Sequence, residues 1–74
     1  MMLIIKLFDG TKFQLNVEKT STVLYIKEKI QEIKNINVKM QRLLFQGMPM
    51  VNESKIAKYN MNDNSVIHLI LNMM

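Results

Sequence analysis

One run of helical periodicity, residues 22–34, most constrains what this chain can fold into. At about 100° per residue its apolar side chains fall on one stripe, and two glutamates fall on the opposite side. The stripe consists of Val23, Ile26, Ile30 and Ile33. Thr22 or Ser21 is expected to cap the start of this helix, and Asn35 to end it in the left-handed conformation. Because so short a helix is marginal alone in water, it must pack against another element.

The N-terminal segment predicts a β-hairpin. Residues 1–7 are apolar and rich in β-branched side chains, and residues 12–17 alternate apolar with polar side chains. Asp9 and Gly10 lie between them, and two strand-like runs around an Asp-Gly pair are a strong hairpin pattern. Phe8 stands at the tip of this hairpin, so we expect its ring to be at least partly exposed.

The C-terminal half predicts further short strands. Residues 40–45 form a strand-like run, and residues 48–50 can pair only as an edge because Pro49 cannot donate to a ladder. A turn of helix is expected near Ile56–Tyr59. The last run, Ser65–Leu71, is apolar on both faces, as in a central strand. This order predicts a single α+β domain over residues 1–74, with one helix on one sheet.

The two faces of the last predicted strand have different expected roles. Side chains alternate between the faces of a strand, so one set meets the helix and the other points away from it. The sets are Ile67, Leu69 and Leu71 on one face and Val66, His68 and Ile70 on the other. The chain leaves no segment to cover the face that points away. We therefore expect Leu44, His68 and Ile70 to form an apolar surface patch, and such patches mark binding sites.

Composition and charge disfavour several other functions. The formal net charge is +4, and the lysines are spread along the chain instead of clustered beside aromatic residues, so nucleic-acid binding is not expected. There is no cysteine, no signal-peptide pattern, and no apolar run near the roughly 20 residues that span a bilayer. His68 is the single histidine, and no cysteine or nearby acidic residue accompanies it. We therefore expect neither an enzyme nor a metal or cofactor site.

At residues 41–47 and 65–71 the sequence resembles the ubiquitin family, including ubiquitin itself and the neddylation modifier. The similarity continues without gaps over residues 1–71. The matching residues include Gly10, Leu15, Val17, Thr22, Lys27, Lys29, Ile30, Gln31, Ile36, Gln41, Arg42, Leu43, Phe45, Gly47, Tyr59, Asn60, His68 and Leu69. The resemblance implies a ubiquitin-like β-grasp fold, in which a mixed five-stranded sheet clasps one helix. It also implies that the hydroxyl of Tyr59 braces a loop.

The resemblance further implies that the chain acts by protein recognition. Family members bind receptors through an apolar surface with a polar rim. Its positions are held here by Phe8, Leu44, His68 and Ile70, with the rim at Arg42, Gln46 and Gly47. A second family surface corresponds to Ile36, Leu71 and Phe8. The implied partners are ubiquitin-binding domains, proteasome receptor subunits and ubiquitin-pathway enzymes, which a monomer would meet in the cytoplasm and nucleus.

The chain departs from the family pattern in its tail and in its lysines. Conjugated family members end in Arg-Leu-Arg-Gly-Gly, and the last glycine carries the carboxylate that is transferred. This sequence ends in Asn72, Met73 and Met74, so as given it is not expected to be conjugated. Lysines through which the family forms chains are replaced by Thr11, Ile33, Met48 and Asp63. The remaining candidate linkage lysines are Lys6, Lys27 and Lys29.

Three functions therefore stay open. The favoured hypothesis is an unconjugated ubiquitin-like interaction domain from the N-terminus of a longer protein. The alternative is a conjugated modifier of the ubiquitin or neddylation type whose C-terminal diglycine is absent from these 74 residues. A weaker third is a stand-alone mimic that occupies receptors without being transferred. Leu24, Tyr25 and Ile33 make the outer helix flank unusually apolar, which indicates either sequence drift or a docking surface.

Overall fold

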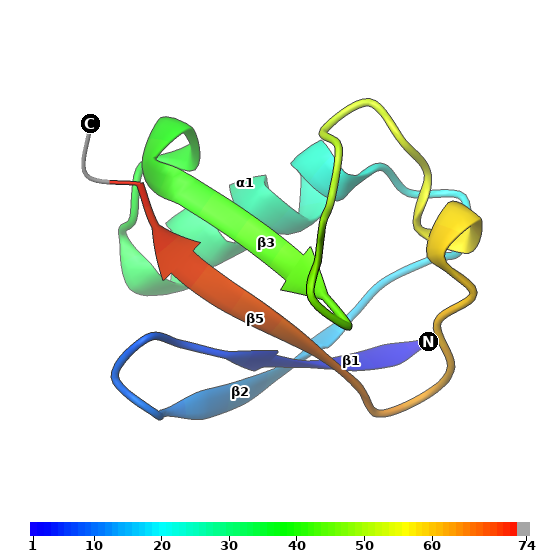
Figure 1. The fold of residues 1–74 in the computed structure, drawn as a ribbon, viewed down its shortest axis with the longest axis horizontal. Coiled ribbons are helices and arrows are strands. Elements are labelled where there is room, and N and C mark those ends of the chain that lie inside the picture. The colour runs from blue at the N-terminus through cyan, green and yellow to red at the C-terminus, as the bar shows by residue number, and fades with distance from the viewer. Residues whose placement is uncertain (73–74) are drawn as a thin grey trace.

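The computed structural model describes residues 1–72 and contains one helix packed on a five-stranded sheet (Figure 1). The strands are β1 (Met2–Lys6), β2 (Lys12–Asn16), β3 (Gln41–Phe45), β4 (Met48–Pro49) and β5 (Ser65–Leu71). The helix is α1 (Val23–Lys34), and 3-10 turns lie at Val38–Met40 and Ile56–Tyr59. The sheet order is β2-β1-β5-β3-β4, with β1 and β5 parallel and the other pairs antiparallel. This mixed sheet with its helix confirms the predicted α+β fold of the ubiquitin-like β-grasp type.

The N-terminal hairpin forms as predicted, with β1 and β2 paired along their whole length. At its tip the carboxylate of Asp9 accepts hydrogen bonds from the Thr11 hydroxyl at 2.7 Å and the Thr11 N–H at 3.0 Å. These bonds stabilise the ionised form and hold the pKa of the Asp9 carboxyl below its ordinary value. Gly10 completes the turn at a φ of +90°, a conformation that glycine adopts without strain. The turn leaves Phe8 59% exposed, which confirms the expectation for this ring.

Both ends of α1 are capped by the residues that the sequence indicates. The Thr22 hydroxyl accepts a hydrogen bond of 3.2 Å from the Tyr25 N–H, which also donates to the Thr22 carbonyl at 3.1 Å. Asn35 takes the left-handed conformation at a φ of +57°, and its N–H donates to the Gln31 carbonyl at 2.8 Å. The helix therefore spans the predicted run, with Thr22 as its cap.

The buried face of α1 differs from the predicted stripe at one residue. Val23, Ile26 and Ile30 are fully buried as expected, whereas Ile33 is 51% exposed, so its place on the buried stripe was wrong and its place on the outer flank is confirmed. The fourth buried residue is Lys27. At roughly 100° per residue the buried side chains span the arc from Ile26 to Lys27, and Ile33 falls just outside that arc. Ile33 therefore lies on the outer flank of the helix.

The strand predicted over residues 40–45 begins one residue later, because Met40 belongs to a 3-10 turn. The Asn37 side chain caps this turn by accepting a 2.8 Å hydrogen bond from the Lys39 N–H. The two residues of β4 pair with β3 at the edge of the sheet, as predicted for a segment that contains Pro49. The predicted helical turn at Ile56–Tyr59 is also present as a 3-10 turn. The sequence thus located these elements and missed one short turn.

The hydrophobic core lies between α1 and the face of the sheet that it covers. In Figure 1, β3 and β5 cross in front of the helix, so the viewer looks onto the opposite face of the sheet. Ile67 and Leu69 of β5 are 0% and 1% exposed, as the alternation of that strand predicted. The core residues are Leu3, Ile5, Leu7, Leu15, Val17, Val23, Ile26, Ile30, Leu43, Phe45, Met50, Ile56, Met61, Ile67 and Leu69. One face of the sheet thus builds the core and the other faces outward.

The loop between β4 and the second 3-10 turn is held by a tyrosine. The N–H of Val51 donates a hydrogen bond of 2.8 Å to the hydroxyl of Tyr59. Tyr59 is half-buried and packs against the core. The predicted bracing role of this hydroxyl is therefore confirmed.

Candidate recognition surface

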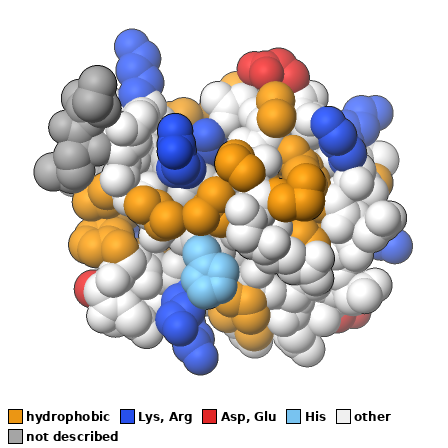
Figure 2. Space-filling view, in the orientation of Figure 1, with side chains coloured by type: hydrophobic (Ala, Val, Ile, Leu, Met, Phe, Trp, Pro, Cys, Tyr) orange, Lys and Arg blue, Asp and Glu red, His pale blue; other side chains and the backbone are white. Residues whose placement is uncertain are grey.

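The outward face of the sheet carries apolar side chains that no segment among residues 1–72 covers. Val66 and Ile70 of β5 are 37% and 43% exposed, and the intervening His68 is also exposed. Leu44 of β3 is half-buried and lies directly opposite His68 in the ladder. Figure 2 shows apolar side chains gathered in a band beside the single histidine of the chain. These side chains are the exposed counterpart of the core residues on the other face.

Strand pairing sets the spacing of this surface. His68 of β5 has Leu44 opposite it on β3 and Lys6 opposite it on β1. Ile70 has Arg42 opposite it on β3. Directly opposed residues on neighbouring strands stand about 4.5–5.5 Å apart at Cβ, so these five side chains are in reach of one another. The apolar band is therefore bordered by a basic residue on each of two sides, Lys6 on β1 and Arg42 on β3.

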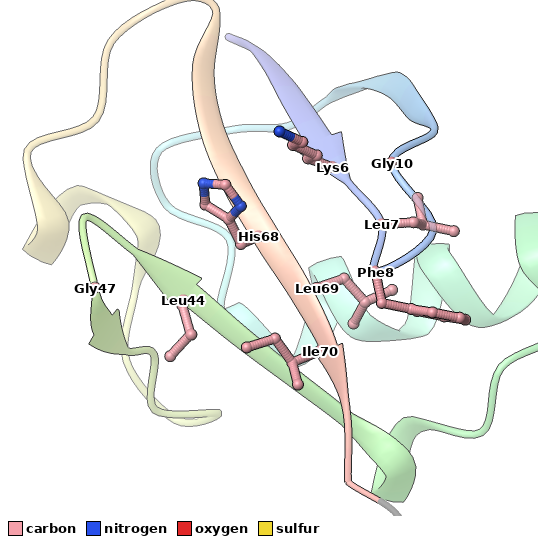
Figure 3. A pocket seen from close by; sticks show the side chains of 9 residues that line it. All are labelled: Lys6, Leu7, Phe8, Gly10, Leu44, Gly47, His68, Leu69 and Ile70. Atoms are coloured by element: carbon pink, nitrogen blue, oxygen red, sulfur yellow. The ribbon is translucent and has the colours of Figure 1, made fainter.

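Phe8 completes this surface from the hairpin turn. A shallow hollow separates the turn from β5, and its lining includes Phe8, Leu44, His68 and Ile70 (Figure 3). We call these four residues the recognition surface. In Figure 3, Leu44 and Ile70 project from adjacent strands, and the Phe8 ring lies across the hollow from them. The structure therefore brings together all four residues that the sequence predicted as one patch.

Several further residues contribute to the hollow. The sequence predicted Gly47 on its rim, and Gly47 lines it with a φ of +79° in the turn between β3 and β4. Lys6 and the buried side chains of Leu7 and Leu69 also line it, and sequence reasoning assigned none of them to this surface. Alternation along β1 placed Lys6 on the outward face, so its position could have been found. The contribution of Leu7 depends on the shape of the turn, which no residue pattern specifies.

The second predicted surface is less compact. Ile36 packs partly buried against the core, and Leu71 is half-buried at the end of β5. Neither residue lines the hollow that Phe8 borders. Gln41 connects the two, because it pairs with Leu71 and its side-chain amide donates to the Ile36 carbonyl at 3.0 Å. The structure thus groups Ile36 with Leu71 through Gln41, and it does not join them to Phe8 in this hollow.

The three candidate linkage lysines occupy different environments. Lys6 is half-buried on the outward face of β1. The ammonium of Lys29 lies 3.9 Å from the Glu32 carboxylate and 5.5 Å from the centre of the Tyr25 ring. Lys27 is only 8% exposed, and burial together with the nearby charge of Arg42 lowers its pKa from the ordinary value. Lys6 and Lys29 are accessible amines, whereas Lys27 is packed inside.

The described residues show neither a metal cluster nor a membrane span. In residues 1–72, no three His, Cys, Asp or Glu side chains lie together as metal ligands would. Within that same part of the chain, no helix has the length and apolar character needed to cross a bilayer. The predicted departure from the family pattern in the tail includes Met73 and Met74, which lie outside the described residues.

Comparison with known proteins agrees with this geometry. The profile of the ubiquitin family matches residues 3–74. The ubiquitin-like protein NEDD8 of Dictyostelium discoideum is 30% identical over 71 residues, which cover 96% of this chain and 92% of that protein. Ubiquitin-like protein 1 of Schizosaccharomyces pombe is 30% identical, with 96% of this chain and 91% of its own covered.

A third relative is longer than this chain. Ubiquitin-like protein 4A of Rattus norvegicus is 31% identical over 96% of this chain, but the match covers 45% of that relative. The chain therefore spans nearly all of two relatives and less than half of the third. The family profile, these identities and the β-grasp fold agree with one another, and the chain belongs to the ubiquitin family.

Proposed function

We propose that this chain is a ubiquitin-like interaction domain of the ubiquitin–proteasome system, which binds ubiquitin receptors or proteasome subunits through the recognition surface. The observation that carries the proposal is the exposure of Phe8 and Ile70, at 59% and 43%, beside one hollow. Exposed apolar area gains free energy when a partner removes it from water. The same side chains contribute little to the core, so their common use is recognition.

The polar neighbours of the surface define what a partner would present. An apolar side chain of the partner would enter the hollow between Phe8 and Ile70. Lys6 and Arg42 border the apolar band, and they would favour acceptors or carboxylates at the partner's periphery. His68 offers a ring edge that can donate or accept a hydrogen bond beside Leu44. Apolar contact supplies the affinity in this arrangement, and the charged rim sets the orientation.

The test is an NMR titration with an isolated ubiquitin-binding domain, comparing variants that remove exposed side chains. Leu44→Ala and Ile70→Ala should each weaken binding at least about tenfold, because each removes central contact area. Val51→Ala is the matched control, since Val51 is 47% exposed and does not line the hollow. Wild-type affinity in both surface variants would refute the proposal.

A conjugated modifier of the ubiquitin or neddylation type is the second candidate. It is supported by the similarity to the ubiquitin-like protein NEDD8 of Dictyostelium discoideum, which is 30% identical over 71 residues. In that case the partly exposed side chains of Lys6 and Lys29 would suit chain linkage better than the buried Lys27. The intact mass of the protein in its own cells separates the two functions. Heavier covalent adducts of a small protein would indicate a modifier, and one much larger polypeptide would indicate a domain.

The remaining properties follow from the recognition role. We infer a non-catalytic protein that works as a monomer in the cytoplasm and nucleus, without a cofactor. Its partners would be ubiquitin-binding domains, proteasome receptor subunits and enzymes of the ubiquitin pathway. Ile36 and Leu71 would form a secondary contact next to the recognition surface. Size-exclusion chromatography with light scattering tests the monomer, and imaging of the tagged native protein tests the location.

A further inference from the structure

A second hollow lies outside the recognition surface and has the opposite chemical character. It is bordered by α1, the 3-10 turn at Val38–Met40, β3 and the segment after β4. Its basic side chains are Lys27, Lys39 and Arg42, and none of its nine lining residues is acidic. It shares no lining residue with the hollow beside Phe8. We call it the cationic hollow.

Lys27 is the buried member of the cationic hollow. It is 8% exposed. Among residues 1–72 no carboxylate lies within ion-pair distance of its ammonium, because the ion pair in that part of the chain joins Lys29 to Glu32. Burial first, and then the charge of Arg42, lower the pKa of Lys27, while Glu53 outside the lining acts in the opposite direction. The Lys27 ammonium is thus partly desolvated without a counter-ion in contact, which is unfavourable. A bound anion would supply that counter-ion.

The wall of the cationic hollow also holds unfilled hydrogen-bond acceptors. Gln41 is 4% exposed, and its Nε2 donates to the carbonyls of Lys27 at 2.9 Å and Ile36 at 3.0 Å. Its Oε1 is buried and has no hydrogen-bond partner among residues 1–72, and the same holds for Oδ1 of Asn52. Buried acceptors are normally satisfied in folded proteins, so two of them beside one hollow point to a missing donor. Neutral oxygens cannot neutralise the charge of Lys27.

The lining favours an acidic side chain over a small inorganic anion. Val38, Pro49 and Met50 add apolar contact area to the cationic hollow, and the methylenes of a glutamate stem would pack on it. A peptide also brings N–H donors for the unfilled oxygens, whereas phosphate at neutral pH brings mainly acceptors. Arg42 lies opposite Ile70, so a partner on the recognition surface can reach the cationic hollow.

We propose that the cationic hollow binds an acidic segment of a protein partner, with a glutamate or aspartate carboxylate held between Lys27, Lys39 and Arg42. The site shares only the rim residue Arg42 with the recognition surface and none of its four apolar and histidine residues, so the peptide titration and the receptor titration test the two proposals separately. A partner that used both would be anchored by apolar contact and oriented by the carboxylate.

The probe is a blocked tetraglutamate peptide, titrated into the ¹⁵N-labelled protein at low ionic strength. We expect saturable shifts of the backbone amides of Lys39 and Arg42 and of the side-chain amides of Gln41 and Asn52. The double variant K39Q/R42Q should bind at least about tenfold more weakly, because charge-assisted contacts are lost. The matched control K12Q/K55Q removes the same charge outside the cationic hollow and should stay within about threefold of wild type.

Three outcomes would overturn the proposal. Equal losses in the two double variants would mean that net charge alone attracts the peptide. Identical shifts with inorganic phosphate at the same concentration would mean a small-anion site without preference for a peptide. Loss of peptide binding in Leu44→Ala would place the peptide on the recognition surface instead.

A second measurement tests the role of Lys27 in binding without a substitution that could unfold the protein. The ¹³C shift of its ε-methylene reports the titration of its ammonium. In the free protein we expect the pKa of Lys27 to lie below the ordinary value for a lysine, and peptide binding should raise it, since a carboxylate favours the charged form. A pKa that stays constant at peptide saturation would exclude Lys27 from the site.

Discussion

The two faces of β5 use nearly the same side chains for opposite purposes. On one face Ile67 and Leu69 are 0% and 1% exposed and pack in the core under α1. On the other face Val66 and Ile70 are 37% and 43% exposed. An isoleucine thus stabilises the fold at position 67 and stays available to a partner at position 70. Topology, through the single helix, therefore decides which apolar residues are structural.

The largest expected effect is the loss of stability in Ile67→Ala. Truncating a fully buried isoleucine removes its transfer free energy and leaves a cavity, so the free energy of unfolding should fall by about 2–5 kcal/mol. Ile30→Ala in α1 should cost a similar amount, because Ile30 is also 0% exposed. Ile70→Ala is the matched change on the outer face, and its stability should stay within about 0.5 kcal/mol of wild type. Urea denaturation followed by circular dichroism measures all three.

The distinction between the two faces of β5 would be wrong if truncation lowered the stability equally on both. A loss above about 2 kcal/mol in Ile70→Ala would mean that this side chain also stabilises the fold, and the recognition argument would lose its basis. A small loss in Ile30→Ala would contradict the packing of α1 on the sheet. Receptor binding should follow the reverse order, intact in the folded fraction of Ile67→Ala and weak in Ile70→Ala.

Lys27 allows the same comparison of buried and exposed positions on α1, because it lies at a buried position of the helix but carries the charge that is typical of a surface residue. In the folded protein the pKa of Lys27 is lowered from the ordinary value of 10.5. At a pH between the folded and the unfolded pKa, the unfolded chain therefore binds more protons than the folded protein. Its contribution to the free energy of unfolding therefore rises with pH through that window and is unfavourable at pH 7. Lys27→Met should stabilise the protein at pH 7, by less than the core truncations cost, and this gain should shrink toward pH 10.5.

Urea denaturation of wild type and Lys27→Met at pH 7 and pH 10 measures this gain, and Lys12→Met is the exposed control. A destabilised Lys27→Met at pH 7 would mean that the ammonium makes favourable contacts inside the cationic hollow. The buried lysine would then be a structural partner, and its availability to a ligand would be in question.

Most of the fold could be predicted from local patterns in the sequence. The hairpin follows from alternation around Asp9 and Gly10, and α1 from its period and its caps. Ile33 is the exception in α1. Its angle around the helix axis is close to that of Ile26. The two residues differ in exposure because the sheet covers only part of the helix, and helical periodicity holds no information on the position of the sheet. The 3-10 turn at Val38–Met40 was missed because a single short turn has no period.

The recognition surface could be predicted better than the cationic hollow. Leu44, His68 and Ile70 follow from strand alternation once β5 is central, and Phe8 follows from its place at a turn. The cationic hollow gathers Lys27, Lys39 and Asn52 from three separate segments. Within its own segment, each of these residues has the pattern of an ordinary exposed polar residue. Tertiary packing alone brings them together, and the burial of a lysine is contrary to what its residue type predicts.

A smaller effect is expected at the helix cap. Thr22→Ala removes the hydroxyl that accepts from the Tyr25 N–H at 3.2 Å and leaves that donor with only the carbonyl of residue 22, at 3.1 Å. The free energy of unfolding should fall by about 1 kcal/mol, well below the loss in Ile67→Ala. Thr22→Ser keeps the hydroxyl and should retain most of the stability. A loss in Thr22→Ala as large as that of a core truncation would mean that local capping, and not burial under α1, dominates the stability of the helix.

The smallest expected effect is at Lys29, whose side chain is 37% exposed on the outer flank of α1. Its ammonium lies 3.9 Å from Glu32 and 5.5 Å from the Tyr25 ring centre, and solvent screens both contacts. Lys29→Gln should therefore change the free energy of unfolding by no more than about 0.5 kcal/mol, and 1 M salt should abolish part of that change. Glu32→Gln is the matched variant, because it removes the ion pair and keeps the contact with Tyr25. A loss above about 1 kcal/mol in Lys29→Gln but not in Glu32→Gln would assign the stability to the lysine–tyrosine contact. The outer flank of α1 would then contribute to the fold, and exposure alone would no longer separate recognition residues from structural ones.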